Sequence, residues 1–294
     1  MMKLAGSLSE KDKEKALYEI IGVPYDGNAI NKGSIEGPKE IRNASQRLET
    51  FLWHKKLEVS DLLYYDYGDI KLKHKHFFKA QNIAELVLEH TGIRHVFLGG
   101  DHSITYPLVK YLFEHGEVAS VISIDAHADF RDSYLGNKYS NACVMRRIAE
   151  LVGFEHIVEI GVRSSSADEY APLNKIAIYD ADVLHEKGVQ GVLEEIGRGE
   201  EKTYLSIDID VLDPGIAPGV EHPEPCGLSL ESLISIVQGI IKGRDVVASD
   251  VVEVNPGLDI ANGITSLNAA RVVFEILACY WKRDNRDDYS HSEK

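Results

Sequence analysis

The chain has 294 residues, of which 44% are hydrophobic and 27% charged, and its formal net charge is −15 at pH 7. The length suits one large α/β domain or two small ones, and we expect a single domain over 1–294 with peripheral ends at 1–15 and 284–294. The acidic balance disfavours binding to nucleic acid and to anionic membranes, because their phosphates would be repelled.

Targeting and cysteine signals predict a soluble cytoplasmic protein. Cys143, Cys226 and Cys279 are far apart and form no CxxC pair, which argues against a disulfide framework and for a reducing compartment. The N-terminal stretch lacks the long apolar core of a signal peptide, and no apolar run reaches the length of a membrane span.

Short apolar runs alternate with helix-like stretches along the chain. Strands are predicted within 18–27, 95–103, 118–129, 156–164, 203–214 and 246–256. Helices are predicted at 37–52, where a proline lies near the start, at 229–243 and at 266–283. Apolar strands separated by helices indicate an α/β fold with a mostly parallel sheet and helices on each side. In such sheets, binding groups gather beyond the carboxyl ends of the strands.

Three of the apolar runs end in acidic and histidine side chains. In SIDAHAD, Asp125, His127 and Asp129 occupy alternate positions, and an extended backbone would put all three on one side. In SIDID, two acids again alternate, and GGDHS places a histidine directly after a further strand. The residues from the last two runs are Asp208, Asp210 and His102.

This combination is typical of a binuclear metal site. Two carboxylates at the end of a buried strand, such as Asp208 and Asp210, are unfavourable unless cations or hydrogen bonds neutralise them. Asp125 and Asp129 bring the carboxylates to four, and two divalent ions would cancel that charge. A set rich in oxygen, with two imidazoles and no sulfur, suits Mn²⁺ better than structural Zn²⁺ and leaves room for a bridging water.

In order and type, the three runs resemble the signatures of the ureohydrolase family, which comprises the arginases, agmatinases and their relatives. Other blocks resemble the same family, namely IGVPYDG, GSIEGPKEIRNAS, YYDYGDI, GVRS and ITSLNAARV. The resemblance extends over nearly the whole chain and implies a three-layer α/β/α fold. It also implies a homo-oligomer, a trimer or a hexamer, that hydrolyses a small cationic guanidino compound.

The resemblance further implies roles for individual residues. The residues that would hold two Mn²⁺ ions are His102, Asp125, Asp129 and Asp210, with His127 and Asp208 completing the set. Glu253 would face the substrate guanidinium, and a carboxylate can hold that planar cation by paired hydrogen bonds. A water activated between the ions would attack the guanidinium carbon, and Asp129 would carry the proton to the departing amine.

The loop at 132–143 resembles an agmatinase loop more than an arginase loop, and GVRSSS lacks the acid expected of an arginase. The leading interpretation is therefore hydrolysis of agmatine to putrescine and urea. One position departs from this pattern, because Asn141 stands where a histidine that shuttles protons or orients the substrate is expected. An amide does not titrate near pH 7, so Asn141 offers only hydrogen bonds, and we expect slower but not abolished turnover.

The segment 219–226 also departs from the family pattern. No histidine is expected where His222 stands, and Cys226 replaces a usual glycine. One hypothesis is that His222 reaches the cleft and replaces the missing shuttle, and the alternative is a solvated loop histidine. His74 and His76, in a lysine-rich run, are expected on a solvated face.

Other functions stay open at this point. A guanidinobutyrase, an arginase or a formiminoglutamase would share the metal-binding runs and differ in the loops. A weakly active or regulatory relative has its direct support in Asn141. A single-zinc, deacetylase-like enzyme would share the general fold, but Asp208 and Asp210 together with His102 favour two metals.

Overall fold

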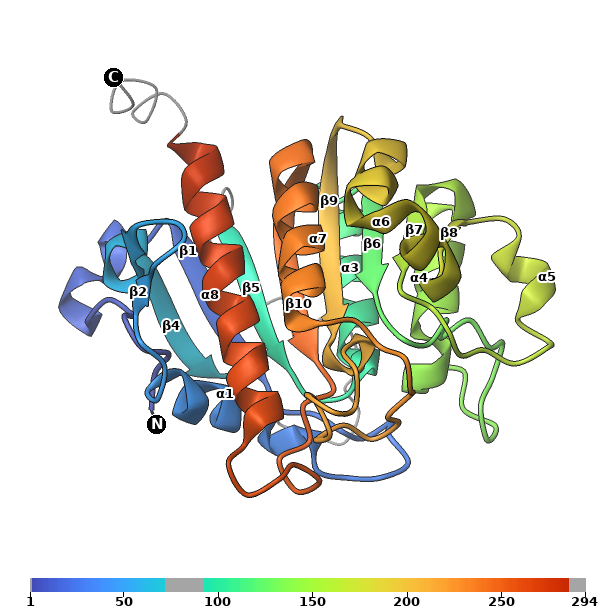
Figure 1. Ribbon diagram of the computed structural model, residues 1–294, viewed down its shortest axis with the longest axis horizontal. Helices are drawn as coiled ribbons and strands as arrows, with labels where there is room; N and C mark the ends of the chain where they lie inside the picture. Colours follow the sequence, from blue (N-terminus) through green and yellow to red (C-terminus); the bar gives the residue numbers. More distant parts are fainter. Residues whose placement is uncertain (1, 72–92, 286–294) are drawn as a thin grey trace.

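The computed structural model describes residues 2–71 and 93–285, and its centre is an eight-stranded sheet (Figure 1). Each described pair of neighbouring strands in this sheet is parallel. In spatial order the strands are β4 (Tyr64–Asp69), β1 (Tyr18–Val23), β5 (Arg94–Gly99), β10 (Arg244–Val252), β9 (Gly199–Asp208), β6 (Ser120–Ile124), β7 (Ile157–Ile160) and β8 (Ala177–Tyr179). A separate antiparallel ribbon joins β2 (Phe51–Leu52) to β3 (Leu57–Glu58).

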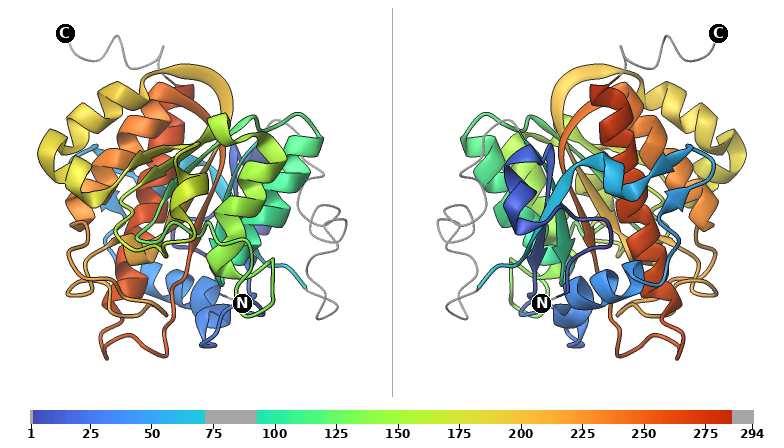
Figure 2. Two further views of the ribbon diagram at one scale, coloured as in Figure 1. Left: turned by 90° about the vertical axis from the view of Figure 1, so that its right-hand side faces the viewer. Right: turned by 90° about the vertical axis from the view of Figure 1, so that its left-hand side faces the viewer.

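Helices cover both faces of the sheet. One face carries α6 (Ala181–Ile196), α7 (Leu230–Gly243) and α8 (Ile264–Asp284), as Figure 2 shows. The opposite face carries α3 (Thr105–Glu114) and α4 (Val144–Val152). α1 (Gly37–Ser45) packs against α8, and α5 (Tyr170–Leu173) is a single turn after β7. The predicted three-layer α/β/α fold with a parallel sheet is confirmed.

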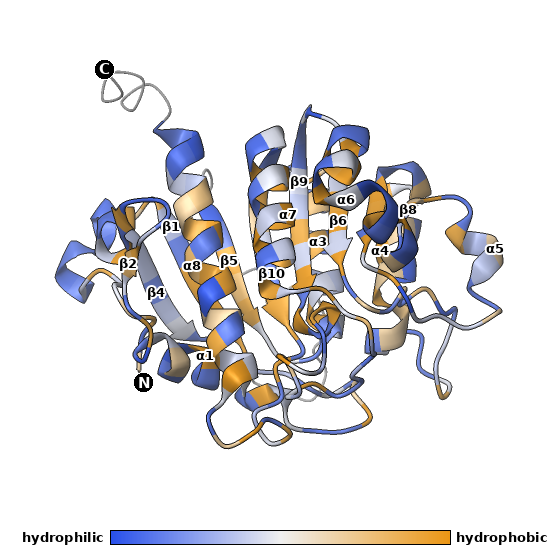
Figure 3. Cartoon of the chain, viewed as in Figure 1, coloured by the Kyte–Doolittle hydropathy of each residue, from blue (hydrophilic) through white to orange (hydrophobic). Residues whose placement is uncertain are grey.

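The hydropathy pattern determines which surfaces are buried (Figure 3). β1 and β6 are buried at every position, because helices cover both faces of the sheet. α7 instead buries one stripe of residues three and four apart, which are Leu233, Ile236, Val237, Ile240 and Ile241. Ser229 caps this helix by accepting a hydrogen bond from the backbone N–H of Ser232, which confirms the start of the predicted helix.

Some boundaries differ from the sequence prediction. The first helix was expected to extend to residue 52, but α1 ends at Ser45. Phe51 and Leu52 pair with β3 instead, and this turns Leu52 into the core. The sequence patterns did not predict β4, β8, α3, α4 or α6. β4 and β8 are edge strands of mixed polarity, so they lack the continuous apolar run of a central strand.

The N-terminal segment is only partly peripheral. Glu10–Lys15 forms a 3-10 helix with no buried residue, as expected for a surface segment. Leu4, however, is buried, and its backbone N–H donates to Oδ2 of Asp66 at 2.7 Å. His74, His76 and most of the predicted C-terminal segment lie outside the described residues. Across residues 2–71 and 93–285, no helix has the length and apolar character needed to cross a membrane.

Candidate metal centre and active site

The carboxyl ends of four adjacent strands bring the predicted site residues together. His102 follows β5, Asp125 follows β6, Asp208 ends β9, and Glu253 follows β10. These strands are neighbours in the order β5-β10-β9-β6, so their ends meet at one edge of the sheet. Segments that lie far apart in the sequence therefore contribute to one site.

His102 is the centre of a first group of possible metal ligands. Its Nδ1 atom lies 3.0 Å from Oδ2 of Asp125, 3.0 Å from Oδ2 of Asp129 and 3.4 Å from Oδ2 of Asp208. His102 and Asp125 are buried, whereas Asp129 is partly open to the cleft. Within the described residues, His102 Nδ1 and Asp125 Oδ2 are both buried, and although they lie 3.0 Å apart, neither makes a hydrogen bond of normal geometry.

A second group shares Asp125 with the first. Nδ1 of His127 lies 2.9 Å from Oδ2 of Asp210 and 3.7 Å from Oδ1 of Asp125. In each group the ligand atoms of three residues lie within 4.8 Å of one another. Because one carboxylate belongs to both groups, the arrangement fits two adjacent cations. The oxygen-rich and sulfur-free donor set fits a hard divalent ion such as Mn²⁺.

The backbone at both acidic runs turns, which corrects the expectation of an extended chain. Asp125 Oδ1 accepts the backbone N–H of His127 at 2.6 Å, and Asp208 Oδ1 accepts that of Asp210 at 2.9 Å. An aspartate that bonds the backbone two residues on makes a tight turn. Farther along the first run, Asp129 has φ = +49°, in the left-handed region, so the backbone is not extended there either. The acids meet because of these turns and not because of strand alternation.

The pKa values of the cluster reflect its crowding. Burial and the charges of Asp210 and Asp129 raise the pKa of Asp125 to about 7. Burial and the Asp210 carboxylate also raise the pKa of Asp208 well above its ordinary value. Burial lowers the pKa of His127, but the Asp210 carboxylate outweighs burial, so the pKa of His127 rises to about 10. The cluster therefore favours bound positive charge, either protons or metal ions.

Two polar residues behind His102, Ser206 and Asp250, were not predicted as part of the site. Ser206 Oγ lies 3.0 Å from Nε2 of His102 and donates to Oδ1 of Asp250 at 2.7 Å. Because a hydroxyl has a single hydrogen, Ser206 must accept from Nε2–H, and Nδ1 is left facing the carboxylates. Asp250 also accepts from Thr105 and Tyr204 at 2.7 and 2.8 Å. The signal in the sequence was the carboxylate inside the apolar run VVASDVV.

Glu253 stands beside the metal groups with one free oxygen. Its Oε1 accepts the backbone N–H of His102 at 2.7 Å and the side-chain amide of Asn141 at 3.2 Å. Its Oε2 is buried and has no hydrogen-bond partner in the described parts of the chain. The backbone of Glu253 has φ = +64°, a strained conformation for a non-glycine residue that often marks a functional site. Glu253 and Asn141, which were predicted separately as site residues, are thus in contact.

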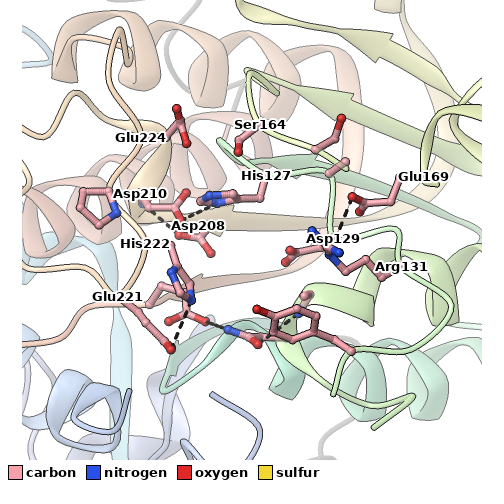
Figure 4. Close-up of a pocket in the computed structure, with 17 residues that line it drawn as sticks. His127, Asp129, Arg131, Ser164, Glu169, Asp208, Asp210, Glu221, His222 and Glu224 are labelled. Atoms are coloured by element: carbon pink, nitrogen blue, oxygen red, sulfur yellow. Dashed lines mark hydrogen bonds and ion pairs between the residues drawn. The ribbon is translucent and has the colours of Figure 1, made fainter. Parts of the chain in front are cut away.

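Part of this cluster lines a cleft of about 400 Å³, namely His127, Asp129, Asn141, Asp208, Asp210 and Glu253 (Figure 4). Its acidic lining residues are Asp129, Glu169, Asp208, Asp210, Glu221, Glu224 and Glu253. His222 also lines the cleft, with its ring centroid 6.2 Å from that of His127, and its side chain is 48% exposed. It therefore reaches the cleft and is also solvated, and the hypothesis that it replaces the missing shuttle stays a prediction. Cys226 has φ = +63°, which explains why a glycine is usual at this position.

A parallel sheet between two layers of helices, with carboxylates and imidazoles at the carboxyl ends of its strands, is typical of α/β metal-dependent hydrolases. The model of the arginase family matches residues 16–279. The chain therefore belongs to the arginase family, the ureohydrolases, and is a hydrolase that acts on C–N bonds of guanidino compounds.

Several curated relatives align with most of this chain. A 32.2 kDa protein of Methanothermus fervidus is 38% identical over 90% of this chain and 92% of its own length. The agmatinase of Pyrococcus horikoshii is 33% identical over 90% and 93% of the two chains. The guanidinobutyrase of Pseudomonas aeruginosa is 32% identical over 94% and 90%. Arginase 1 of Arabidopsis thaliana is 37% identical, but over only 66% of this chain and 57% of its own length.

Solved structures agree with this assignment. The agmatine ureohydrolase of Thermoplasma volcanium superposes with a TM-score of 0.86 and 30% identity, over 98% of this chain and 97% of its own. The proclavaminate amidino hydrolase of Streptomyces clavuligerus has a TM-score of 0.85 and 28% identity, over 96% and 98%. These relatives are named for different substrates, so the comparisons establish the family but not which guanidino compound this enzyme hydrolyses.

Proposed function

We propose that this enzyme hydrolyses agmatine to putrescine and urea at a dimanganese centre. The observation that carries the proposal is a pair of Asp/His groups that share Asp125 and lie beside the unpartnered Oε2 of Glu253. The shared carboxylate suits two cations, and the free carboxylate oxygen suits a guanidinium.

The residues proposed to hold the ions are His102, Asp125, His127, Asp129, Asp208 and Asp210. When bound, two divalent ions supply the Lewis acidity that makes water a nucleophile near neutral pH. Glu253 accepts N–H groups of the guanidinium and fixes the direction of its carbon toward the cluster. Asp129, the most exposed of the four proposed carboxylate ligands, is suited to pass a proton to the departing amine.

Asn141 is proposed to orient Glu253. Its amide donates to Glu253 Oε1 at 3.2 Å, which leaves Oε2 directed to the substrate. Because an amide does not titrate near neutral pH, Asn141 takes no part in proton transfer. Turnover is therefore slower than with a histidine at this position.

Agmatine is favoured by the acidity of the cleft and by the agmatinases among the relatives. A second candidate is a guanidino acid such as 4-guanidinobutyrate, because Arg131 also lines the cleft and could face a carboxylate. The proposal extends to a cytoplasmic homo-oligomer, a trimer or hexamer, on the family resemblance. Sedimentation of the purified enzyme tests the assembly.

The test is a titration of metal-stripped enzyme with Mn²⁺ while urea release is measured from agmatine, arginine and 4-guanidinobutyrate. The expected result is activity on agmatine that saturates near two metals per chain. Activity on 4-guanidinobutyrate alone would favour the second candidate. Two bound metals without urea from any of the three would favour a regulatory relative, and one bound metal would reject the binuclear centre.

A further inference from the structure

The cleft contains a second carboxylate that neither the metal groups nor the proposed guanidinium contact uses. Glu221 follows β9 and lies next to His222, on the wall opposite Arg131 and Glu169 (Figure 4). Its Oε1 accepts the backbone N–H of Asn31 at 2.5 Å and lies 3.3 Å from Nε2 of His222. Its Oε2 is buried and has no hydrogen-bond partner among the described residues.

Glu221 and Glu253 share this unsatisfied state. Each has one oxygen held by protein donors and one buried oxygen without a donor in the described chain. Burial, Asp101 and also the charge of Glu221 raise the pKa of Glu253, so the two carboxylates are near enough to act on each other. A buried carboxylate oxygen without a donor is unfavourable. A ligand with a cationic donor at each end would satisfy both oxygens.

The surroundings keep Glu221 in its charged form. Burial raises its pKa, but hydrogen bonds from His222 and from the backbone of Asn31 outweigh burial, and the pKa lies below its ordinary value. Arg131, on the other wall, already has partners, since its guanidinium lies 5.1 Å from the Tyr134 ring and 3.9 Å from the Glu169 carboxylate. The unsatisfied charge of the cleft walls is therefore negative.

We propose that Glu221 is a specificity-determining residue that binds the cationic tail of the substrate through Oε2, while Glu253 holds the guanidinium. The inference rests on the proposed function, because it assigns the second end of the same substrate. A guanidine with a neutral or anionic tail would leave Glu221 Oε2 without a donor. The cleft therefore selects a guanidine that ends in an ammonium group over a guanidino acid.

Glu221→Gln tests this role. The amide keeps the shape of the side chain and an oxygen for the Asn31 N–H, but it removes the charge. Glu224→Gln is the matched control, because Glu224 lines the same cleft from the same segment and its described hydrogen bonds use its backbone carbonyl. Wild type and both variants, loaded with Mn²⁺, are assayed with agmatine and with pentylguanidine, which has a methyl group in place of the ammonium.

We expect Glu221→Gln to lower kcat/KM for agmatine about 10- to 100-fold, chiefly through KM, and to change pentylguanidine turnover less than about twofold. Glu224→Gln should leave both substrates near wild type. Equal losses on both guanidines would overturn the inference, because Glu221 would then act only by shaping the segment. An unchanged KM for agmatine, or a wild-type preference for 4-guanidinobutyrate, would also overturn it.

Calorimetric binding of agmatine separates this inference from the proposed function. Weaker binding to Glu221→Gln, with no urea release by the wild type, would retain the tail contact and reject agmatine hydrolysis. Urea release from agmatine with equal binding to both proteins would retain the hydrolysis and reject the tail contact. No agmatine binding by the wild type would reject both.

Discussion

Replacing Ser206 by alanine is expected to weaken Mn²⁺ binding about 10- to 100-fold, although Ser206 is not a proposed ligand. The Ser206 hydroxyl accepts a hydrogen bond from Nε2–H of His102 at 3.0 Å and donates one to Oδ1 of Asp250. Without it, the imidazole loses the partner that fixes its tautomer and rotation, and a buried N–H is left unsatisfied. Such a loss costs about 1–3 kcal/mol, and tenfold in affinity corresponds to about 1.4 kcal/mol.

The measurement is a calorimetric titration of metal-stripped protein with Mn²⁺. Ser123→Ala is the matched control, because Ser123 is the register partner of Ser206 on β6 and is fully buried. Its hydroxyl has no hydrogen-bond partner among the described residues, so its removal should leave Mn²⁺ affinity unchanged. Equal affinity losses in both variants, or none in Ser206→Ala, would refute a role for the Asp250–Ser206–His102 chain.

Three further predictions concern the neighbour of Glu253, the metal ligands and a buried ion pair. Asn141→His should raise kcat for agmatine, because it adds a titratable group beside Glu253, and an unchanged kcat in a steady-state urea assay would contradict this. Burial lowers the pKa of His127, but Asp210 raises it to about 10 overall, so below that pH Mn²⁺ must displace a proton from His127. The affinity for Mn²⁺ should therefore rise with pH between 6 and 9, by up to about tenfold per pH unit for each proton released. A Kd for Mn²⁺ that does not change with pH would exclude this. Arg42→Ala should lower the free energy of unfolding by about 3–5 kcal/mol in urea titrations, because it leaves Asp66 buried without its bidentate partner. A loss below about 1 kcal/mol would show that the ion pair is dispensable.

The parallel sheet and the gathering of these acids and histidines at one edge of it could be predicted, because both leave local signals. A strand buried on both faces is a continuous apolar run, and acids or histidines at its end have few structural reasons to be there. The turns after Asp125 and Asp208 left no comparable signal, so the extended backbone expected for both runs was wrong. A side-chain hydrogen bond to the backbone had replaced strand geometry.

The supporting residues were harder to predict because their partners come from distant segments. Asp250 interrupts an apolar strand, which indicates a buried carboxylate that needs donors. Its donors Thr105, Tyr204 and Ser206 lie on other elements, and no spacing in the sequence connects them to it. Glu221 gave even less signal, since an acid in a loop is ordinarily solvated. Only the packing of its segment against the backbone of Asn31 reveals it.

The position of β10 has a consequence for synthesis on the ribosome. β10 is the last strand of the described chain, yet it lies in the middle of the sheet, between β5 and β9. Until it is made, the nascent chain can form only two part-sheets, β4-β1-β5 and β9-β6-β7-β8, each with an apolar edge that lacks its neighbour. Such edges favour aggregation, so we expect the incomplete chain to aggregate more readily than the finished protein. A chain that stops before Arg244 loses the centre of its sheet and not merely an end.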